Sequence, residues 1–562
     1  MTLIAVILWP LFLAALASIP VLRERAGMLA PLGVLPALWL WLAGPIDASL
    51  QLPGVLTGVT LALDAPGRVF LALTALAWLA ASIGLWRGMV ADNRWRFVLF
   101  WLLTLAGNLT WVLAGDAVSF YLGFTLMSLA AWGLVVHSGQ PPALRAGRVY
   151  LVMALAGEMA ILAGLMMRVA AAGSADFQTL ATHPVDLVTV LLLFLGFGIK
   201  IGVPLLHMWL PLAHPAAPVP ASAVLSGVML KAGIAGWLRF LPGAVAMPEW
   251  GVVLIVVGIL AMFLGVVVGL AQSRPKTILA YSSISQMGWL TAGVGLWLAA
   301  EGPSEALLAA VLLFALHHGL AKSALFLSLG LVPGGRLTPG LRLLAWLPAL
   351  ALAALPMTSG MVAKAALKGQ FMVGGPALDV LLILAGMGTF WLMLHFFAQL
   401  PKQKSASRFQ VDPWLLGSWI LLVLVGQGLF WWWPQPELAR AQLEAGKLLS
   451  SLWPAALALV IYFWLDRIGR LPRHLLPAWP EGDVLAGFER IWQRAVRGIR
   501  LLGAGFDRGQ QQGWAGICRH AEALSGLLVR LLAQERNMRL WHHFILIWAA
   551  LLLVVALLLV PG

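Results

Sequence analysis

Lysines inside apolar stretches are the residues of this sequence that are best suited to chemistry. Each side chain that could ionise near the centre of a bilayer costs about 2.5 to 3.5 kcal/mol, so it needs a partner, water or a function. Burial lowers the pKa of a lysine and a nearby carboxylate raises it, so such a lysine can gain and lose a proton as its neighbour changes. Five lysines lie in apolar runs: Lys200, Lys231, Lys322, Lys364 and Lys368. We interpret them together as a proton relay. A helix-end lysine that reaches the interface is the alternative for any single one.

Histidines and one carboxylate stand beside these lysines. Glu158, in LAGEMAILAG, is the only carboxylate deep inside an expected helix, so acid partners for the lysines are few. Histidine titrates near neutral pH and suits a relay. The histidines that we expect to share it are His207, His214, His317 and His318. Zinc or haem ligation is the rival role, but no recognisable spacing supplies a full ligand set. We therefore expect no cofactor.

The composition requires that most of the chain lie in a membrane. Of 562 residues, 61% are hydrophobic and only 10% are charged, which excludes both a soluble globular protein and a disordered chain. The 36 basic and 22 acidic residues give a net charge of +14, but the basic residues are spread over short connections and form no nucleic-acid stripe. Cys518 is the only cysteine, so any iron-sulfur cluster must belong to a partner.

Apolar runs of about 20 residues predict an all-α polytopic protein with about 16 transmembrane helices. Basic residues follow the odd-numbered runs, and neutral or acidic connections follow the even-numbered ones. Because cytoplasmic loops carry the excess of lysine and arginine, this alternation predicts that both termini lie outside. We expect the first run, Ile4–Val21, to be a retained helix, because it lacks the leading charge and cleavage site of a secretory signal.

Two of the lysines lie beside expected breaks in the seventh and twelfth helices. Lys200 precedes Gly202 and Pro204, whereas Lys364 follows Pro356 and Gly360. Interrupted helices in corresponding positions of two halves are typical of inverted-repeat transporters. An ordinary proline kink is the alternative for each break. The expected organisation is N-terminal helices at 1–93, two five-helix repeats at 94–242 and 251–400, extra helices at 413–467, an amphipathic segment at 482–539 and a transmembrane anchor at 540–562.

The amphipathic segment is identified by its spacing. Apolar residues recur every three or four positions from Phe488 to Phe506 and, after a slip, from Trp514 to Leu531, and every cation of the segment is an arginine. Such a helix lies along the interface or along other helices. Its length favours contact with neighbouring subunits, and a helix that lies on its own domain or on lipid is the alternative.

Four ordered motifs resemble one family. They are GFGIKIGVPLLHMWLPLAHPAAPVPASAVLSGVMLKAGIAGWLRF, KTILAYSSISQMGW, HHGLAKSALF and LPMTSGMVAKAALKG. They are similar to the antiporter-like membrane subunits of respiratory complex I, of Mrp-type antiporters and of group 4 hydrogenases, and AHPAAP and SGVMLK look most like the hydrogenase-4 component B branch. The segment 482–539 resembles the lateral helix of the distal pump subunit.

The resemblance implies proton translocation driven by events in partner subunits of a bacterial inner-membrane complex. It places the family's lysine of the broken seventh helix at Lys200, the central lysine at Lys231 and the exit-side residue at Lys364. His318 and Lys322 match the family's histidine-to-lysine spacing. At the family's glutamate position this chain reads FYLGFTLMSL, with Thr125 in place of the acid. Glu158, one helix further on, is our candidate substitute.

Three functions remain open from the sequence. The first is a proton-translocating, non-catalytic subunit of a redox-driven complex, hydrogenase-like or complex I-like. The second is an antiporter or ion-uptake module that exchanges sodium or another solute without redox coupling. The third is a structural subunit that has lost pumping. All three predict lipid and other membrane subunits as partners.

Overall fold

The computed structural model describes residues 2–45, 47–54, 58–88, 93–331, 337–371, 375–400, 411–432, 436–470 and 480–482, with 484, 485 and 487. The chain divides into two compact units, residues 1–50 with 60–481 and residues 51–59 with 482–562. All the residues that we expect to take part in the proton relay lie in the first unit. The expected amphipathic segment and anchor fall outside the described residues, apart from Gly482, Val484, Leu485 and Gly487. The domain bounds and inverted repeats remain predictions.

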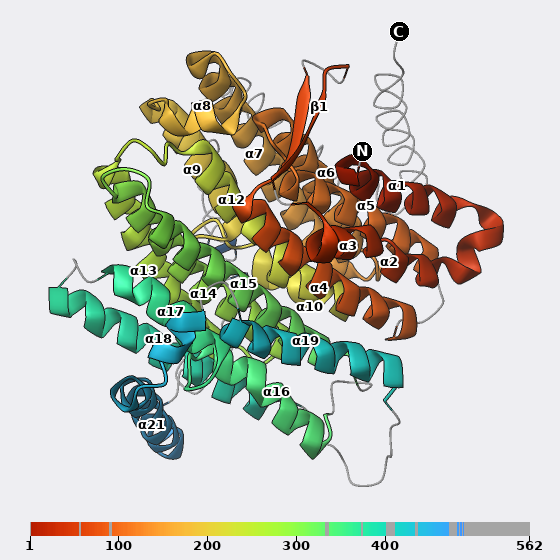
Figure 1. Ribbon diagram of the computed structural model, residues 1–562. Coiled ribbons are helices and arrows are strands. Elements are labelled where there is room, and N and C mark those ends of the chain that lie inside the picture. Colours follow the sequence, from red (N-terminus) through yellow and green to blue (C-terminus); the bar gives the residue numbers. More distant parts are fainter. Residues whose placement is uncertain are drawn as a thin grey trace, which may run out of the picture. The chain divides into compact units, whose positions relative to one another are not determined.

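Helices dominate the described chain (Figure 1). Their bounds up to the first break are α1 Thr2–Ser18, η1 Pro20–Met28, α2 Leu29–Leu32, α3 Leu35–Ala43, α4 Ala65–Gly88, α5 Arg94–Val112, α6 Ala117–Val135, α7 Pro141–Ala172, α8 Phe177–Thr182 and α9 Leu187–Ile201. Those that follow are α10 Leu210–Ala216, α11 Val219–Val224, the π turn η2 Leu225–Met229, α12 Lys231–Phe240, α13 Pro248–Leu270, α14 Pro275–Ala299, α15 Glu305–Ser328, α16 Pro339–Leu352, α17 Ser359–Gln370, α18 Gly375–Gln399, α19 Pro413–Trp432, α20 Pro436–Ala441 and α21 Ala445–Arg467.

Within the described residues, ten helices are long and apolar enough to cross a membrane, and four shorter apolar helices accompany them. The chain is therefore an integral membrane protein, while the expected count of about 16 spans remains a prediction. The 25-residue α14 is not among the ten, because its serines, Gln286 and other polar residues lower its mean hydropathy. Nearly all of α14 is nevertheless buried, so its polar side chains face other helices.

A small sheet corrects the expectation of an all-α chain. Strands β1 (Ala48–Leu52) and β2 (Val59–Leu63) pair with each other. The Ala62 amide donates to the Leu113 carbonyl, and the Gly115 amide donates to the Thr60 carbonyl. Strand β2 is therefore also hydrogen-bonded to the segment that connects α5 to α6. These strands are only five residues long, which is too short for alternation to stand out beside the apolar helical runs.

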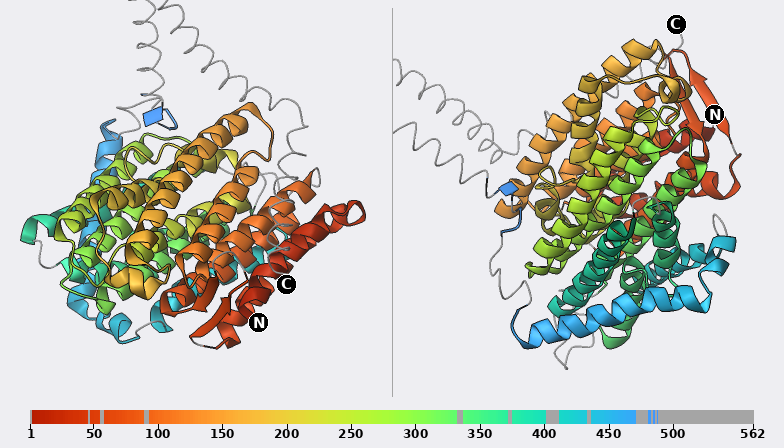
Figure 2. Two further views of the ribbon diagram at one scale, coloured as in Figure 1. Left: turned by 90° about the horizontal axis from the view of Figure 1, so that it is seen from above. Right: turned by 90° about the vertical axis from the view of Figure 1, so that its left-hand side faces the viewer.

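Helices α13 and α14 pack closely against each other (Figure 1). A Cβ atom at Gly251 would lie 2.5 Å from the Gly295 carbonyl oxygen, and one at Gly258 would lie 2.5 Å from the Gly288 carbonyl oxygen. These glycines recur every seven residues along both helices, so one face of each helix lets the two backbones touch. Helix α15 packs against α14, α4 and α17, and α21 packs against α18 at one side of the helical bundle (Figure 2).

Candidate functional site

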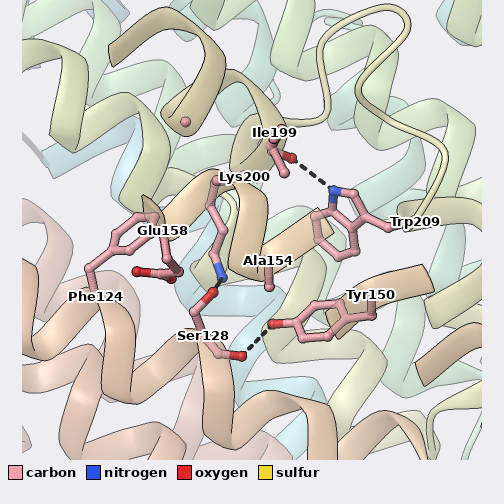
Figure 3. Close-up of a pocket in the computed structure, with 10 residues that line it drawn as sticks. Phe124, Ser128, Tyr150, Ala154, Glu158, Ile199, Lys200 and Trp209 are labelled. Carbon is pink, nitrogen blue, oxygen red and sulfur yellow. Dashed lines mark hydrogen bonds between the residues drawn. The ribbon is translucent and has the colours of Figure 1, made fainter. Parts of the chain in front are cut away.

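Lys200 and Glu158 line one small buried cavity between α6, α7 and α9 (Figure 3). The Lys200 Nζ donates to the Ser128 Oγ over 2.9 Å. The Thr125 Oγ1 donates to the Glu158 Oε2 over 2.5 Å, so the residue at the expected acid position contacts the acid of the next helix. Lys200 is 6% exposed and Glu158 is 4% exposed. The cavity measures about 20 Å³, which is room for about one water molecule.

The end of α9 holds Lys200 beside a backbone break. Gly202, at φ 78°, takes the left-handed conformation that ends a helix, and Val203 donates its amide back to the Gly198 carbonyl. The Trp209 Nε1 donates to the Ile199 carbonyl over 2.8 Å, which satisfies an acceptor that the ended helix leaves open. The expected break after Lys200 is therefore present, and a tryptophan beyond it fixes the chain.

Lys231 follows a π turn instead of an ordinary helical turn. Its Nζ donates to the Ser226 carbonyl within that turn over 2.8 Å, and its side chain is fully buried. The Ser226 and Ser283 hydroxyls are 2.7 Å apart, which connects the turn to α14. A Cβ at Gly227 would lie 1.9 Å from the Ser323 Oγ, so α15 approaches the turn closely. Such π turns interrupt the regular ladder and frequently occur at functional sites.

Helix α15 carries His317, His318 and Lys322 through the interior. The Lys322 Nζ donates to the Leu279 carbonyl of α14 over 2.9 Å. The His317 Nδ1 lies 2.9 Å from the Ser359 Oγ, at the start of α17. Both ring nitrogens of His318 are buried without a hydrogen-bond partner among the described residues. Buried polar groups normally have partners, and ordered water is the usual one when protein atoms do not supply them.

Lys364 is the buried lysine beside the second break, as Lys200 is beside the first. Its Nζ donates to the Leu352 carbonyl, the last residue of α16, over 2.9 Å, and lies 5.3 Å from the ring centre of Trp289. A Cβ at Gly360 would lie 1.6 Å from the Ala351 carbonyl oxygen, so only glycine lets α17 start so close to the end of α16. Both expected breaks are thus observed, each with a buried lysine beside it.

The remaining expected residues are placed differently. His207 lies in the first break, fully buried, with its ring centre 6.3 Å from that of Tyr281. His214 lies in the short α10, where its ring stacks on Phe326 at 4.8 Å. Lys368 lies near the surface and forms an ion pair with Asp379 at 3.2 Å. Its position therefore differs from that of the four buried lysines.

The serines and the tyrosine around the lysines were not predicted from the sequence. Ser128 and Ser226 accept hydrogen bonds from Lys200 and Lys231, and Ser359 contacts His317. Ser283 contacts the Ser226 hydroxyl, and the Tyr150 hydroxyl donates to the Ser128 carbonyl over 2.7 Å. A serine or tyrosine in an apolar helix adds little to the cost of inserting that helix into a bilayer, so its presence does not indicate a functional site. The one available signal is the polar run YSSISQ in α14, where Gln286 also donates to the Thr389 hydroxyl over 3.0 Å.

Known proteins are similar to this chain in sequence and in fold. Hydrogenase-4 component B of Escherichia coli is 34% identical over 42% of this chain and 37% of its own length. NADH-quinone oxidoreductase subunit M of the same species is 28% identical over 69% of this chain and 82% of its own. The chain thus spans less than half the length of the hydrogenase relative.

Two solved structures have the same fold. A structure of the Mrp complex from Dietzia sp. matches 94% of this chain and 63% of its own chain with a TM-score of 0.75 at 23% identity. The membrane-bound sulfane sulfur reductase, an archaeal respiratory membrane complex, matches 95% of this chain and 100% of its own chain with a TM-score of 0.69 at 21% identity. The family model described as "NADH:quinone oxidoreductase/Mrp antiporter, TM" matches residues 114–393. Through this core, which contains both breaks and all four buried lysines, the chain belongs to the family of antiporter-like membrane subunits.

Proposed function

We propose that this chain moves protons across the membrane as one subunit of a multisubunit, redox-driven complex. The observation that carries the proposal is the set of four buried lysines, each donating to a hydroxyl or a carbonyl oxygen. A lysine with a neutral acceptor can release its proton without leaving a carboxylate unpaired, whereas a lysine in a tight buried ion pair is held charged. This arrangement suits residues that exchange protons.

In the proposed path, Glu158 and Lys200 form the first station. Their shared cavity has room for about one water, which could pass a proton between the two side chains. Lys231, His318 and Lys322 form the central stations, because the π turn and α15 pack together. His317 and Ser359 connect them to α17, which carries Lys364. His207 and His214 are secondary members beside the first break.

Redox coupling is favoured over sodium exchange by the sequence relatives. Hydrogenase-4 component B and NADH-quinone oxidoreductase subunit M are named for redox complexes. The alternative, an Mrp-type cation/proton antiporter or ion-uptake subunit, is supported by the fold shared with the Mrp complex. The copurifying subunits decide between them: iron-sulfur or nickel-iron subunits support redox coupling, and small antiporter subunits support exchange.

A subunit that has lost pumping is the third possibility. Lys200→Ala and Lys231→Ala test it in the assembled complex, by proton transport measured in reconstituted vesicles. The proposal expects each change to lower transport by about 100-fold, the usual scale for losing a positioned proton-transfer group. Unchanged transport in both variants would assign the chain a structural role instead.

A further inference from the structure

A second, larger cavity opens between α17, α18 and α21, away from Lys200 and Glu158. It measures about 230 Å³, against about 20 Å³ for the cavity beside Lys200. Helix α21 and Gln442 follow residue 393, so the part of the wall that they form lies outside the family core.

Every polar side chain that lines this cavity can donate a hydrogen bond. The polar side chains that line it belong to Lys364, Lys368, Gln442, Lys447, Ser450 and Ser451. No aspartate or glutamate is among the described residues that line it. Asp379 and Glu444 lie outside the lining and form ion pairs with Lys368 at 3.2 Å and with Lys447 at 3.6 Å. An ammonium group has three donors, so each lysine keeps donors for a group inside the cavity.

The opposite wall of the cavity is apolar. It includes Leu382, Met387 and Phe390 of α18 and Ala455 of α21. Apolar side chains on the outer faces of the same two helices are exposed, among them Leu384 at 44% and Leu457 at 44%. Trp453, which also lines the cavity, is 50% exposed and has the amphipathic ring that favours membrane interfaces.

We propose that this cavity binds the phosphate-bearing headgroup of an anionic phospholipid. Lys368 and Lys447 are each paired with a carboxylate outside the lining, so Lys364 supplies the positive charge that no described carboxylate pairs with. The remaining donors of the three lysines, with the serine and glutamine side chains, can bind phosphate oxygens. The apolar wall of the cavity and the exposed apolar side chains of the same two helices favour a lipid over a free anion. The bound phosphate would lie beside Lys364, so under the proposed function the lipid would favour the protonated form of that lysine.

Lipid binding to the purified full complex tests the proposal. Spin-labelled phosphatidylglycerol and phosphatidylcholine are titrated into the delipidated complex, with inorganic phosphate alone as a third arm. The variants are Lys447→Gln and Lys368→Gln, and Arg274→Gln is the control because it is an exposed cation at the start of α14 that does not line the cavity. Removing one charged contact to phosphate should weaken binding about ten-fold.

The expected result is selective binding of phosphatidylglycerol that falls in both lysine variants and is unchanged in Arg274→Gln. Binding of inorganic phosphate that competes fully with the lipid would support the anion site and identify its source as a soluble phosphate. Equal affinity of the wild type and both lysine variants for phosphatidylglycerol, with the melting temperatures of all proteins unchanged, would overturn the proposal. Because this readout is binding, failure of proton transport would not affect it.

Discussion

At the scale of single residues, the arrangement of Thr125 and Glu158 explains how the chain could work without an acid on α6. The two side chains meet at 2.5 Å, so a carboxylate carried by α7 reaches the place where the resemblance expects one from α6. Both helices contribute to the cavity that contains Lys200. The exchange of position keeps an ionisable carboxyl group in the cavity with the lysine while changing the helix that supplies it.

Glu158→Gln should lower proton transport by about 100-fold, because it removes the ionisable carboxyl group of the first station. Adding Thr125→Glu to this variant should restore a substantial part of the transport, since the new carboxylate would occupy the same region. Proton transport by the reconstituted complex measures both. Glu249→Gln, at an exposed position on α13, is the matched control. Full activity of Glu158→Gln would show that Lys200 works without this acid.

The four buried lysines could be predicted from the sequence, because a cation in an apolar run is costly wherever the helix lies. The groups that accept hydrogen bonds from these lysines could not be predicted from the sequence. Ser226 and the Leu279 carbonyl meet lysines only through tertiary packing, and neither stands out in its own segment. Residue type alone does not show whether a lysine is buried. Lys368 lies one turn from Lys364, yet it reaches the surface and pairs with Asp379.

At the scale of elements, glycine and proline predicted both helix breaks, because their backbone requirements are local. The close pairing of α13 and α14 was not predicted, although its glycines recur at a constant spacing of seven residues. Small residues indicate that a helix can approach another backbone closely, but they do not indicate which helix that is. The sheet of β1 and β2 was also not predicted, since it depends on pairing between short segments.

Gly258→Ala should destabilise the protein by about 1 to 3 kcal/mol, because the new Cβ would lie 2.5 Å from the Gly288 carbonyl oxygen. Helix α14 would be displaced, and it carries the Leu279 carbonyl that accepts from Lys322. Thermal unfolding in detergent measures the loss. The control is Gly417→Ala on α19, where nothing lies within 4 Å of the new atom. Equal melting temperatures for the two variants would contradict the close packing.

An ion pair joins the start of α4 to the end of α12. Arg239 donates to both oxygens of Asp64, over 2.5 and 2.7 Å. Burial pushes the pKa of Asp64 upward, but the hydrogen bonds and charge of Arg239 outweigh it and hold the pKa below its ordinary value of 3.8. A lowered native pKa means that the stabilisation is present above pH 3.8 and disappears as the pH falls through the native value.

Asp64→Asn should therefore destabilise the protein at neutral pH by at most about 1 kcal/mol, since the Asp64 side chain is 42% exposed and water screens the pair. The difference from the wild type should shrink as the pH falls below 3.8, where the wild-type carboxyl also becomes neutral. Melting temperatures of both proteins between pH 7 and about pH 3 measure this. A difference that persists at the acidic end would show that the charge is not what matters.

At the scale of the whole molecule, the family core from 114 to 393 contains the proposed relay, and α21 beyond it builds one wall of the second cavity. The composition predicted a membrane protein because few charges are available to cover a soluble surface. Partner subunits could not be derived from composition alone. They are inferred from relatives that are named as subunits of larger complexes.

Purification from its native membrane should yield this chain together with redox subunits that hold iron-sulfur clusters. The physical reason is that a chain with one cysteine cannot hold such a cluster by cysteine ligation, so electron transfer would require another subunit. Mass spectrometry and iron analysis of the purified complex measure this. Small antiporter subunits without iron would assign the chain to the exchange alternative.

The most direct test of the proton path is transport by the complex that carries Lys231→Met, because Lys231 is fully buried at the centre of the proposed relay. The complex is reconstituted in liposomes with an internal pH dye and driven by the electron donor or sodium gradient that its copurifying subunits use. The wild type and Arg274→Gln should move protons at the same rate, and Lys231→Met should be slower by about 100-fold while assembling normally. Proton movement at the wild-type rate in an intact Lys231→Met complex would contradict the account.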